Sequence, residues 1–286
     1  MSLSVPLIDV AALRERLAGA EPPVLLDTSF DLADPAAGER SYREGHLPGA
    51  HYLHLDRDLA DHTHAPGAAF RGRHPLPARE TFAATLGRLG IGPSTQVVVY
   101  DRQGATFAAR AWWMLRWLGH REVAVLDGGL QAWVAAGGAL NQEPPAPRGP
   151  TTYTPAPSLM PTVDADTLAA GLGGLRLIDA RAAERFRGDV EPLDPVAGHI
   201  PGALNRPFKD NLDVQGRFQR PEALREAFLP LLGGRPASEV VHQCGSGVTA
   251  CHNLLAMEAA GLSGAALYPG SWSEWCADPA RPVARG

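Results

Sequence analysis

The sequence predicts an α/β protein with two similar halves, each a mostly parallel sheet with helices on both faces. Three observations lead to this prediction. Short, continuously apolar segments alternate with amphipathic stretches of helical length, which is typical of buried parallel strands and the helices that cover them. Four short motifs recur in the same order in both halves of the 286-residue chain, and a proline-rich stretch separates those halves.

The first half is expected to begin with a helix that Asp9 caps, because a short acidic side chain accepts a hydrogen bond from the first helical turn. The predicted ranges are helix 10–17, strand 24–27, helix 79–89, strand 97–100, helix 105–118, strand 123–126 and helix 130–135. Residues 31–40 and 58–73 are expected to be long loops, which are more often functional than idle.

The second half repeats this order of elements. Its predicted ranges are helix 164–170, strand 175–179, helix 221–232, strand 240–243, helix 248–260 and strand 265–268. The repeated motifs align residues 24–27 with 176–179, 45–50 with 198–203, 96–106 with 239–249, and 127–133 with 269–275. Ligands of parallel sheets bind outside the carboxyl ends of the strands, which is where Cys244 falls.

A proline-rich segment, residues 143–157, is expected to divide the chain into two domains. Proline cannot sit in a helix interior, so this segment is predicted to be an extended, semi-rigid linker. The first domain then covers residues 1–142 and the second covers residues 158–286. The chain is long enough for each domain to bury its own core.

The composition limits the partners of the protein. Hydrophobic residues make up 45% and charged residues 20% of the chain, and the net charge is −5. This balance argues against a nucleic-acid-binding face or a membrane anchor, and no apolar run approaches the roughly 18 residues of a membrane span. Three cysteines, an odd number, argue against a disulfide framework, so we expect a reducing, cytoplasmic setting.

No metal and no cofactor is expected. The His and Cys residues around the second apolar strand match no zinc spacing; they are His242, Cys244, Cys251 and His252. The glycine-rich residues 171–174 lack the rest of a dinucleotide-binding fingerprint. Cys251 and Cys276 lie in apolar helical stretches and are interpreted as core residues.

The segment that points to chemistry is the turn that follows the strand at 240–243. It reads Cys-Gly-Ser-Gly-Val-Thr, from Cys244 to Thr249, and a helix follows it. Gly245 and Gly247 flank Ser246 and allow the backbone to curl with its amides pointing inward, while the helix adds its positive end at the same point. These N–H dipoles favour a thiolate, so the pattern predicts a cysteine nucleophile at Cys244.

The matching position in the first half is Asp101. A carboxylate cannot act as a soft nucleophile, and its charge repels an anionic substrate. We therefore expect the first domain to be non-catalytic and the second to carry the reaction.

At this point the chain resembles the tandem-domain rhodanese-like sulfurtransferases over nearly its whole length. The resemblance rests on the two His-Leu/Ile-Pro-Gly-Ala motifs, on Cys244 in a six-residue loop, and on residues 270–275, Gly-Ser-Trp-Ser-Glu-Trp. Thiosulfate enzymes of this family tend to have basic residues in the loop after the cysteine, whereas the 3-mercaptopyruvate enzymes have Cys-Gly-Ser-Gly-Val-Thr. Side-chain cations suit the thiosulfate dianion, and amides, a hydroxyl group and an arginine suffice for a monoanionic 2-oxo acid. The loop therefore favours 3-mercaptopyruvate.

The resemblance implies a two-step sulfur transfer without a cofactor. Cys244 takes the sulfur of the donor as a persulfide, pyruvate leaves, and an acceptor such as thioredoxin, another thiol or cyanide collects the sulfur. It also implies a proton relay of Ser246, His74 and Asp56, the last two from the first half of the chain. The loop residues Gly245, Gly247, Val248 and Thr249 are expected to contact the substrate.

Arginines are implied for the carboxylate of the substrate. Arg185 matches the first arginine of the family, but Leu193 stands where a second one usually follows Glu-Pro. We hypothesise that Arg206, just after the second Gly-His-Ile-Pro-Gly-Ala motif, supplies this second cation.

Three other functions are weighed against this prediction. A thiosulfate sulfurtransferase is the nearest alternative, and a sulfur-relay module that receives sulfur from another protein also fits the fold. A cysteine phosphatase would need an arginine six residues after the cysteine to clamp phosphate, and that position is Ala250.

Overall fold

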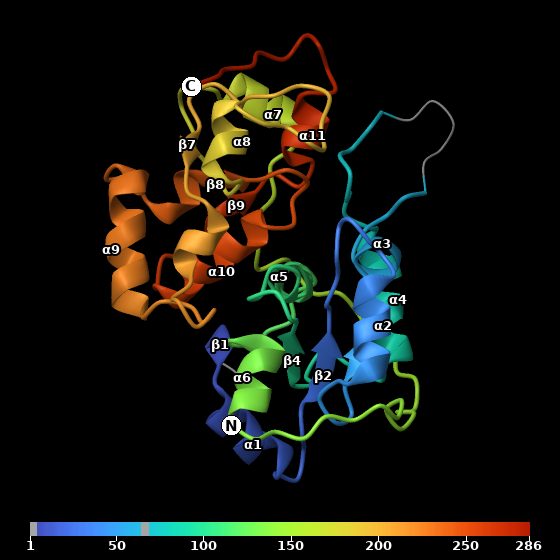
Figure 1. Ribbon diagram of the computed structural model, residues 1–286. Coiled ribbons are helices and arrows are strands. Elements are labelled where there is room, and N and C mark those ends of the chain that lie inside the picture. Colours follow the sequence, from blue (N-terminus) through green and yellow to red (C-terminus); the bar gives the residue numbers. More distant parts are fainter. Residues whose placement is uncertain (1–4, 64–68) are drawn as a thin grey trace. The chain divides into compact units, whose positions relative to one another are not determined.

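The computed structural model describes residues 5–63 and 69–286, which fold into two compact units (Figure 1). Unit 1 consists of Met1–Asp61, Pro77–Leu159 and Val214–Arg217. Unit 2 consists of His62–Leu76, Met160–Asp213 and Phe218–Gly286. The segment His62–Leu76, which lies in the first half of the sequence, therefore belongs to unit 2. The domain limits predicted at residues 142 and 158 remain predictions.

Unit 1 is built on a five-stranded parallel sheet in the order β1-β5-β4-β2-β3. Its strands are β1 (Leu7–Ile8), β2 (Val24–Asp27), β3 (His51–Tyr52), β4 (Val97–Tyr100) and β5 (Val123–Leu126). Its helices are α1 (Val10–Leu17), α2 (Ala37–Glu44), α3 (Leu55–Asp58), α4 (Arg79–Arg88), α5 (Ala108–Trp117) and α6 (Gly129–Ala135). The predicted α/β class with parallel strands is confirmed in this unit.

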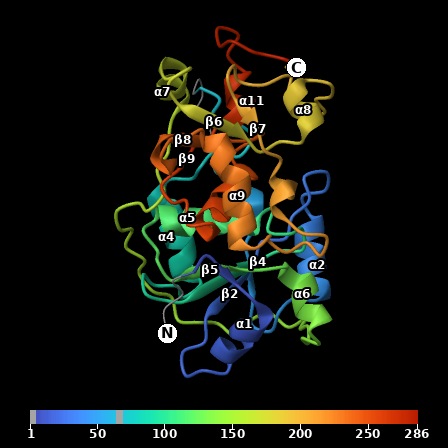
Figure 2. The same cartoon turned by 90° about the vertical axis from the view of Figure 1, so that its left-hand side faces the viewer.

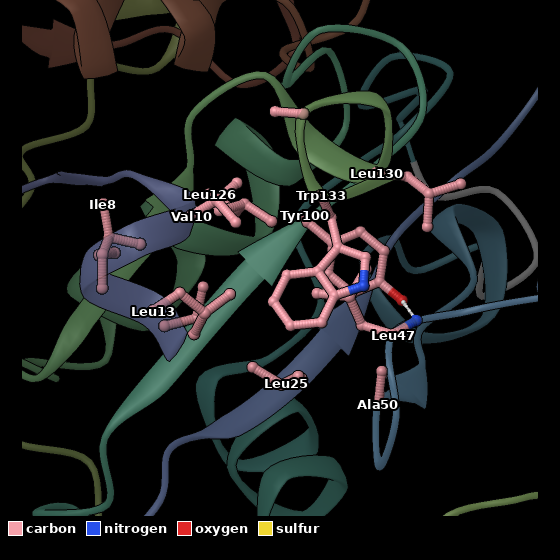
Figure 3. Close-up of a cluster of buried hydrophobic side chains, with 13 residues drawn as sticks. Ile8, Val10, Leu13, Leu25, Leu47, Ala50, Tyr100, Leu126, Leu130 and Trp133 are labelled. Carbon is pink, nitrogen blue, oxygen red and sulfur yellow. Dashed lines mark hydrogen bonds between the residues drawn. The ribbon is translucent and has the colours of Figure 1, made fainter. Parts of the chain in front are cut away.

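Helices cover both faces of this sheet, as Figure 2 shows for α1 and α6 on one side and α4 and α5 on the other. The first face carries a core in which Leu13 of α1 and Trp133 of α6 pack against the strands (Figure 3). Tyr100, at the end of β4, belongs to the same core, and its hydroxyl accepts a hydrogen bond of 3.0 Å from the Leu47 N–H group. That bond ties the first His-Leu-Pro-Gly-Ala turn to the sheet.

Unit 2 repeats the architecture with a four-stranded parallel sheet in the order β7-β6-β8-β9. Its strands are β6 (Arg176–Asp179), β7 (Leu204–Asn205), β8 (Val240–Gln243) and β9 (Ala266–Leu267). Its helices are α7 (Ala165–Ala170), α8 (Ala183–Arg187), α9 (Pro221–Leu232), α10 (Ala250–Ala259) and α11 (Ser271–Trp275), and short 3-10 turns are η1 (Phe208–Asn211) and η2 (Ala237–Glu239). Side chains of α7 and α11 pack on one face of the sheet, and α10 contacts β8, β9 and α9.

Every predicted helix and strand is present, and about half of them have the predicted bounds. The prediction that residues 31–40 form a loop is wrong in part, because α2 begins at Ala37. The helix predicted from residue 105 begins only at Ala108, because the Asp101 carboxylate binds the preceding N–H groups. The helix predicted from residue 248 likewise begins at Ala250.

The proline-rich segment contains no helix or strand, as predicted, but it is not a free spacer. Thr151 donates a backbone hydrogen bond to the Gly87 carbonyl, and Ala156 donates one to the Leu118 carbonyl. Tyr153 is buried, and its hydroxyl lies 3.0 Å from Nδ1 of His120. The segment thus packs along unit 1 and is part of it.

Candidate active site

Cys244 lies directly after β8, at the carboxyl edge of the sheet of unit 2, and only 1% of its surface is exposed. The start of α11 holds it in place. The Cys244 N–H group donates to Oγ of Ser271 over 3.1 Å, and its carbonyl accepts from the Trp272 N–H group over 3.0 Å. Ser271 adopts a φ of 53°, a left-handed conformation that a serine rarely takes. Such a strained residue persists only where its surroundings fix it, which indicates that the cysteine is held rigidly.

Ser246 and His74 are brought together in unit 2. His74 Nδ1 lies 2.7 Å from Ser246 Oγ, and both side chains are buried. The chain around His74 is docked by its neighbours, since the Arg73 N–H group donates to Oγ of Ser273 over 3.1 Å. Gly72 takes a φ of 91°, and a β-carbon there would lie 2.6 Å from the Gly270 carbonyl oxygen. The close approach therefore requires glycine.

Asp56, the third member of the predicted relay, lies in α3 of unit 1, whereas His74 belongs to unit 2. Its backbone N–H group donates to Nδ1 of His54 over 3.1 Å. The part of Asp56 in a relay with His74 stays a prediction.

Two guanidinium groups lie next to the Cys244 loop. A β-carbon at Gly245 would lie 2.9 Å from Nη2 of Arg73 and 3.5 Å from Nη1 of Arg185. Sequence reasoning identified Arg185 but missed Arg73. The only signal for Arg73 was its position directly before His74, because spacing along the chain does not reveal contacts across 172 residues.

Arg206 contacts the η1 turn and α9 of unit 2. Its guanidinium donates to the Asp210 carbonyl over 2.9 Å and to Oδ1 of Asn211 over 3.3 Å, and it lies 5.4 Å from the centre of the Phe228 ring. These contacts fix the η1 turn against α9. The role of Arg206 as a second cation for the substrate stays a prediction, and Arg73 is a guanidinium beside the loop that the prediction did not include.

The arginines at the loop belong to a chain of alternating charges that starts at the end of β6. Asp179 pairs with Arg181, Glu191 contacts both Arg181 and Arg185, and Asp194 contacts both Arg185 and Arg73. Arg181 is buried and stacks on Trp272 at 4.7 Å. Burial opposes its charge, but the neighbouring Asp179 raises the pKa of its guanidinium. The chain of ion pairs therefore connects the sheet edge to the loop through side chains in fixed positions.

Asp101 shows how the equivalent loop of unit 1 is built. Its carboxylate is fully buried and accepts four backbone hydrogen bonds of 2.8–2.9 Å. The donors are the N–H groups of Gln103, Ala105, Phe107 and Ala108. In unit 1, therefore, the Asp101 carboxylate fills the loop, and it stands where unit 2 has the thiol of Cys244.

The other two cysteines, Cys251 and Cys276, are buried, and neither forms a disulfide with another described residue. Cys251 donates from Sγ to the Gly247 carbonyl over 3.4 Å, and burial raises the pKa of the Cys276 thiol to about 11. Within the described ranges, no group of three or more His, Cys, Asp or Glu side chains could hold a metal ion. None of the helices in those ranges is long and apolar enough to cross a membrane.

The chain is similar to known proteins over most of its length. A family model described as "Rhodanese-like domain" matches residues 9–136 and 164–278. The chain is 52% identical over 288 residues to a Pseudomonas aeruginosa protein named "Probable 3-mercaptopyruvate sulfurtransferase", with 99% of both chains covered. It is 34% identical over 256 residues to the thiosulfate sulfurtransferase of Gallus gallus, with 88% of this chain and 85% of that one covered. The solved structure of the 3-mercaptopyruvate sulfurtransferase from Leishmania major matches with a TM-score of 0.84 at 29% identity, covering 96% of this chain and 75% of that one.

Proposed function

The chain belongs to the family of proteins with rhodanese-like domains, and from this premise we propose that it transfers the sulfur of 3-mercaptopyruvate to a thiol acceptor through a persulfide on Cys244. The observation that carries the proposal is the surroundings of Cys244. The loop after it contains no basic side chain, Ser246 Oγ lies 2.7 Å from His74 Nδ1, and two arginines approach the loop from outside. This arrangement suits a small monoanion with a leaving group that needs a proton.

In the first step, the Cys244 thiolate attacks the sulfur atom of 3-mercaptopyruvate. A sulfur–sulfur bond forms as the carbon–sulfur bond breaks, and the electron pair of that bond leaves on the enolate of pyruvate. The enolate then takes up a proton and becomes pyruvate. The hydrogen-bonded Ser246 and His74 side chains are the groups in unit 2 that we assign to this proton transfer, with Asp56 proposed to support His74.

In the second step, an acceptor thiolate attacks the outer sulfur of the persulfide. The new sulfur–sulfur bond forms on the acceptor, and the electron pair of the old one returns to Cys244 as a thiolate. Thioredoxin or a small thiol supplies such a thiolate, whereas cyanide would attack the outer sulfur through carbon and leave with it as thiocyanate. Backbone N–H groups of the loop, on Gly245, Gly247, Val248 and Thr249, are proposed to stabilise the negative charge in both steps.

A thiosulfate sulfurtransferase is the second candidate, and the similarity to the Gallus gallus enzyme supports it. The absence of a cation within the residues 245–249 argues for the first candidate, because the thiosulfate dianion gains most from charges inside the loop. A sulfur-relay module fed by another protein is the third.

The test is to incubate the protein separately with 3-mercaptopyruvate and with thiosulfate, and to follow intact mass together with pyruvate release. We expect one added sulfur atom per chain from 3-mercaptopyruvate, with an equal amount of pyruvate, and none in Cys244→Ser. Faster loading from thiosulfate would reverse the order of the two candidates. If neither donor loads Cys244, the enzyme proposal fails and a protein-fed relay takes its place.

A further inference from the structure

A small cavity lies in unit 2 at the edge of the sheet opposite to Cys244. It has a volume of about 140 Å³ and is lined by the turn at residues 171–174, by the start of β6 and by Pro201. Arg176, at the cavity, is the first residue of β6, whereas Cys244 follows the last residue of the neighbouring parallel strand β8. The length of these strands therefore separates the cavity from the candidate active site.

The lining of the cavity combines positive charge with apolar surface. Its charged side chains are Arg176 and Arg235, and none of the described residues that line it is acidic. The apolar part of the lining consists of Leu168, Leu172, Leu175, Leu177 and Pro201. We propose that this cavity binds a small aliphatic monocarboxylate, whose anionic group pairs with the arginines while its hydrocarbon chain packs against the leucines. This site goes beyond the proposed function and does not depend on it.

Arg176 has donors without acceptors. Its Nε atom is buried, and no described residue accepts a hydrogen bond from it or pairs with the rest of the guanidinium. A β-carbon at Gly233, just after α9, would collide with Nη2, so the guanidinium packs against the C-terminal end of that helix. The partial negative charge of a helix end stabilises a cation there, but it leaves Nε unpaired. Because a buried donor without an acceptor is costly, an anion in the cavity would be stabilised by this group.

Arg235 is the second donor at the cavity. Its Nη1 atom donates to the Gly174 carbonyl and lies 3.3 Å from Oε2 of Glu239. These contacts attach the side chain to the turn at residues 171–174, and no described residue accepts a hydrogen bond from Nε or Nη2. The side chain is 39% exposed, so a ligand can reach it from solvent. Directed N–H donors of this kind match the oxygens of a carboxylate.

The first half of the chain shows that the fold does not require an arginine at the start of this strand. The repeat aligns residues 24–27 with residues 176–179, so Val24 takes the position of Arg176. Val24 begins β2 and pairs with Val97, just as Arg176 begins β6 and pairs with Val240. The charge is thus a property of unit 2 alone, which supports a role in binding.

The volume and the lining limit the ligand. A cavity of about 150 Å³ accommodates about six non-hydrogen atoms. Butyrate, with its carboxylate and short hydrocarbon chain, has this size. Phosphate or sulfate could pair with the arginines but would leave the leucines without an apolar partner, so the lining favours an aliphatic acid.

The test is a titration of the whole protein with butyrate, followed by NMR of the leucine methyl groups. We expect the signals of the cavity leucines to shift with a dissociation constant on the order of a few millimolar. Arg176→Val, which copies the residue of the first half, and Arg235→Gln should each weaken binding about tenfold or more. Arg225→Gln is the matched control, because Arg225 donates to the Ala260 carbonyl and does not line the cavity; it should bind butyrate as the wild type does.

Two further probes separate charge from hydrocarbon. Butyramide has the shape of butyrate without its charge, and inorganic phosphate has charge without a hydrocarbon chain, so each should bind about tenfold more weakly or worse. If either binds as tightly as butyrate, the assigned class of ligand is wrong. If the cavity leucines do not shift at about ten times the expected dissociation constant, or shift equally in both arginine variants, the site itself is wrong.

Loading of Cys244 by 3-mercaptopyruvate tests the proposed function separately. We expect loading to be unchanged in Arg235→Gln, because the cavity lies at the other edge of the sheet. A wild type that binds butyrate but is not loaded would leave this site standing and contradict only the proposed function. If Arg176→Val does not fold by circular dichroism, Arg235→Gln, which changes a more exposed side chain, carries the comparison.

Discussion

At the scale of single residues, Asp101 and Cys244 occupy equivalent positions in the two halves of the chain, but different contacts hold their two loops. The Asp101 carboxylate receives four backbone N–H groups, so the first loop is closed by its own side chain. Cys244 brings a sulfur atom without the two acceptor oxygens, and its loop is held instead by contacts of its backbone with Ser271 and Trp272. One loop design thus serves stability in unit 1 and, by our proposal, chemistry in unit 2.

Asp101→Ala should therefore destabilise the protein strongly. It leaves three buried N–H groups, those of Ala105, Phe107 and Ala108, without an acceptor. Each such group costs about 1–3 kcal/mol, so we expect a loss of at least about 3 kcal/mol in the free energy of unfolding. Urea unfolding measures this loss. Asp34→Ala, which removes an exposed carboxylate paired with Arg40, should leave the free energy of unfolding nearly unchanged. Equal stability of the two variants would mean that the four bonds contribute little.

At the scale of elements, the short helix α11 and the segment around His74 form one support for the site. Backbone groups of α11 hold the Cys244 loop, and Ser273 of the same helix accepts the hydrogen bond from Arg73. Gly72 lies against the Gly270 carbonyl just before this helix. The positions of Ser246 and His74 therefore depend on backbone contacts that carry no chemistry themselves.

Gly72→Ala tests this dependence. The added β-carbon would meet the Gly270 oxygen at 2.6 Å, so the segment must move and carry His74 away from Ser246. We expect pyruvate release to fall about tenfold or more, because a small misplacement of a catalytic group is costly. Gly173→Ala is the control: its φ of 83° is similarly left-handed, but a β-carbon there meets nothing within 4 Å. Equal activity of the two variants would show that the contact at Gly72 does not position His74.

His242, in strand β8, should make the stability of the folded protein depend on pH. Burial lowers its pKa from 6.5 to about 3, so it is neutral in the folded protein, whereas in the unfolded chain it binds a proton below about pH 6.5. Unfolding then takes up a proton, and stability falls by up to about 1.4 kcal/mol per pH unit as the pH drops below 6.5. The free energy of unfolding, measured in urea, should fall between pH 6.5 and pH 5 by about 1.6 kcal/mol less in His242→Leu than in the wild type. An unchanged pH dependence would exclude His242 as its source.

Strands and long helices could be predicted from the sequence because their cause is local. The apolar runs of β2, β4 and β5 and the helix that starts at Pro221 have the predicted bounds. The helix α2 was missed because its sequence, Ala-Gly-Glu-Arg-Ser-Tyr-Arg-Glu, is almost wholly polar. Arg73 was missed because the partner of a long side chain depends on tertiary contacts that no spacing records.

At the scale of the whole molecule, the chain passes repeatedly between the two units. The segment His62–Leu76 interrupts unit 1, and Val214–Arg217 interrupts unit 2. The site in unit 2 consequently uses residues from both halves of the sequence, since His74 and Arg73 lie on the first of these segments. A second half expressed alone would lack both side chains.

Because a segment from the first half of the chain belongs to unit 2, the response of the protein to cleavage of its backbone between the halves can be predicted. We expect that a protease site introduced at the exposed residues 146–150 and cleaved after folding leaves one particle, because the first fragment still supplies His62–Leu76 to unit 2. Size-exclusion chromatography should show the fragments eluting together, with loading of Cys244 retained. Separation without denaturant would contradict the exchange of segments.

The place of the His74 segment in unit 2 also determines when its contacts can form during synthesis. The partners of the His74 segment follow it by 121 to 200 residues, at Asp194, Ser246 and Ser273. On the ribosome, that segment must wait until nearly the entire second half has been translated before it can dock, and contacts so distant in sequence form slowly. By our proposal Cys244 is the nucleophile, and in a nascent chain it thus lacks the hydrogen-bonded Ser246 and His74 pair until translation is almost complete. The proposed sulfur transfer would then begin only once the polypeptide can fold around the cysteine.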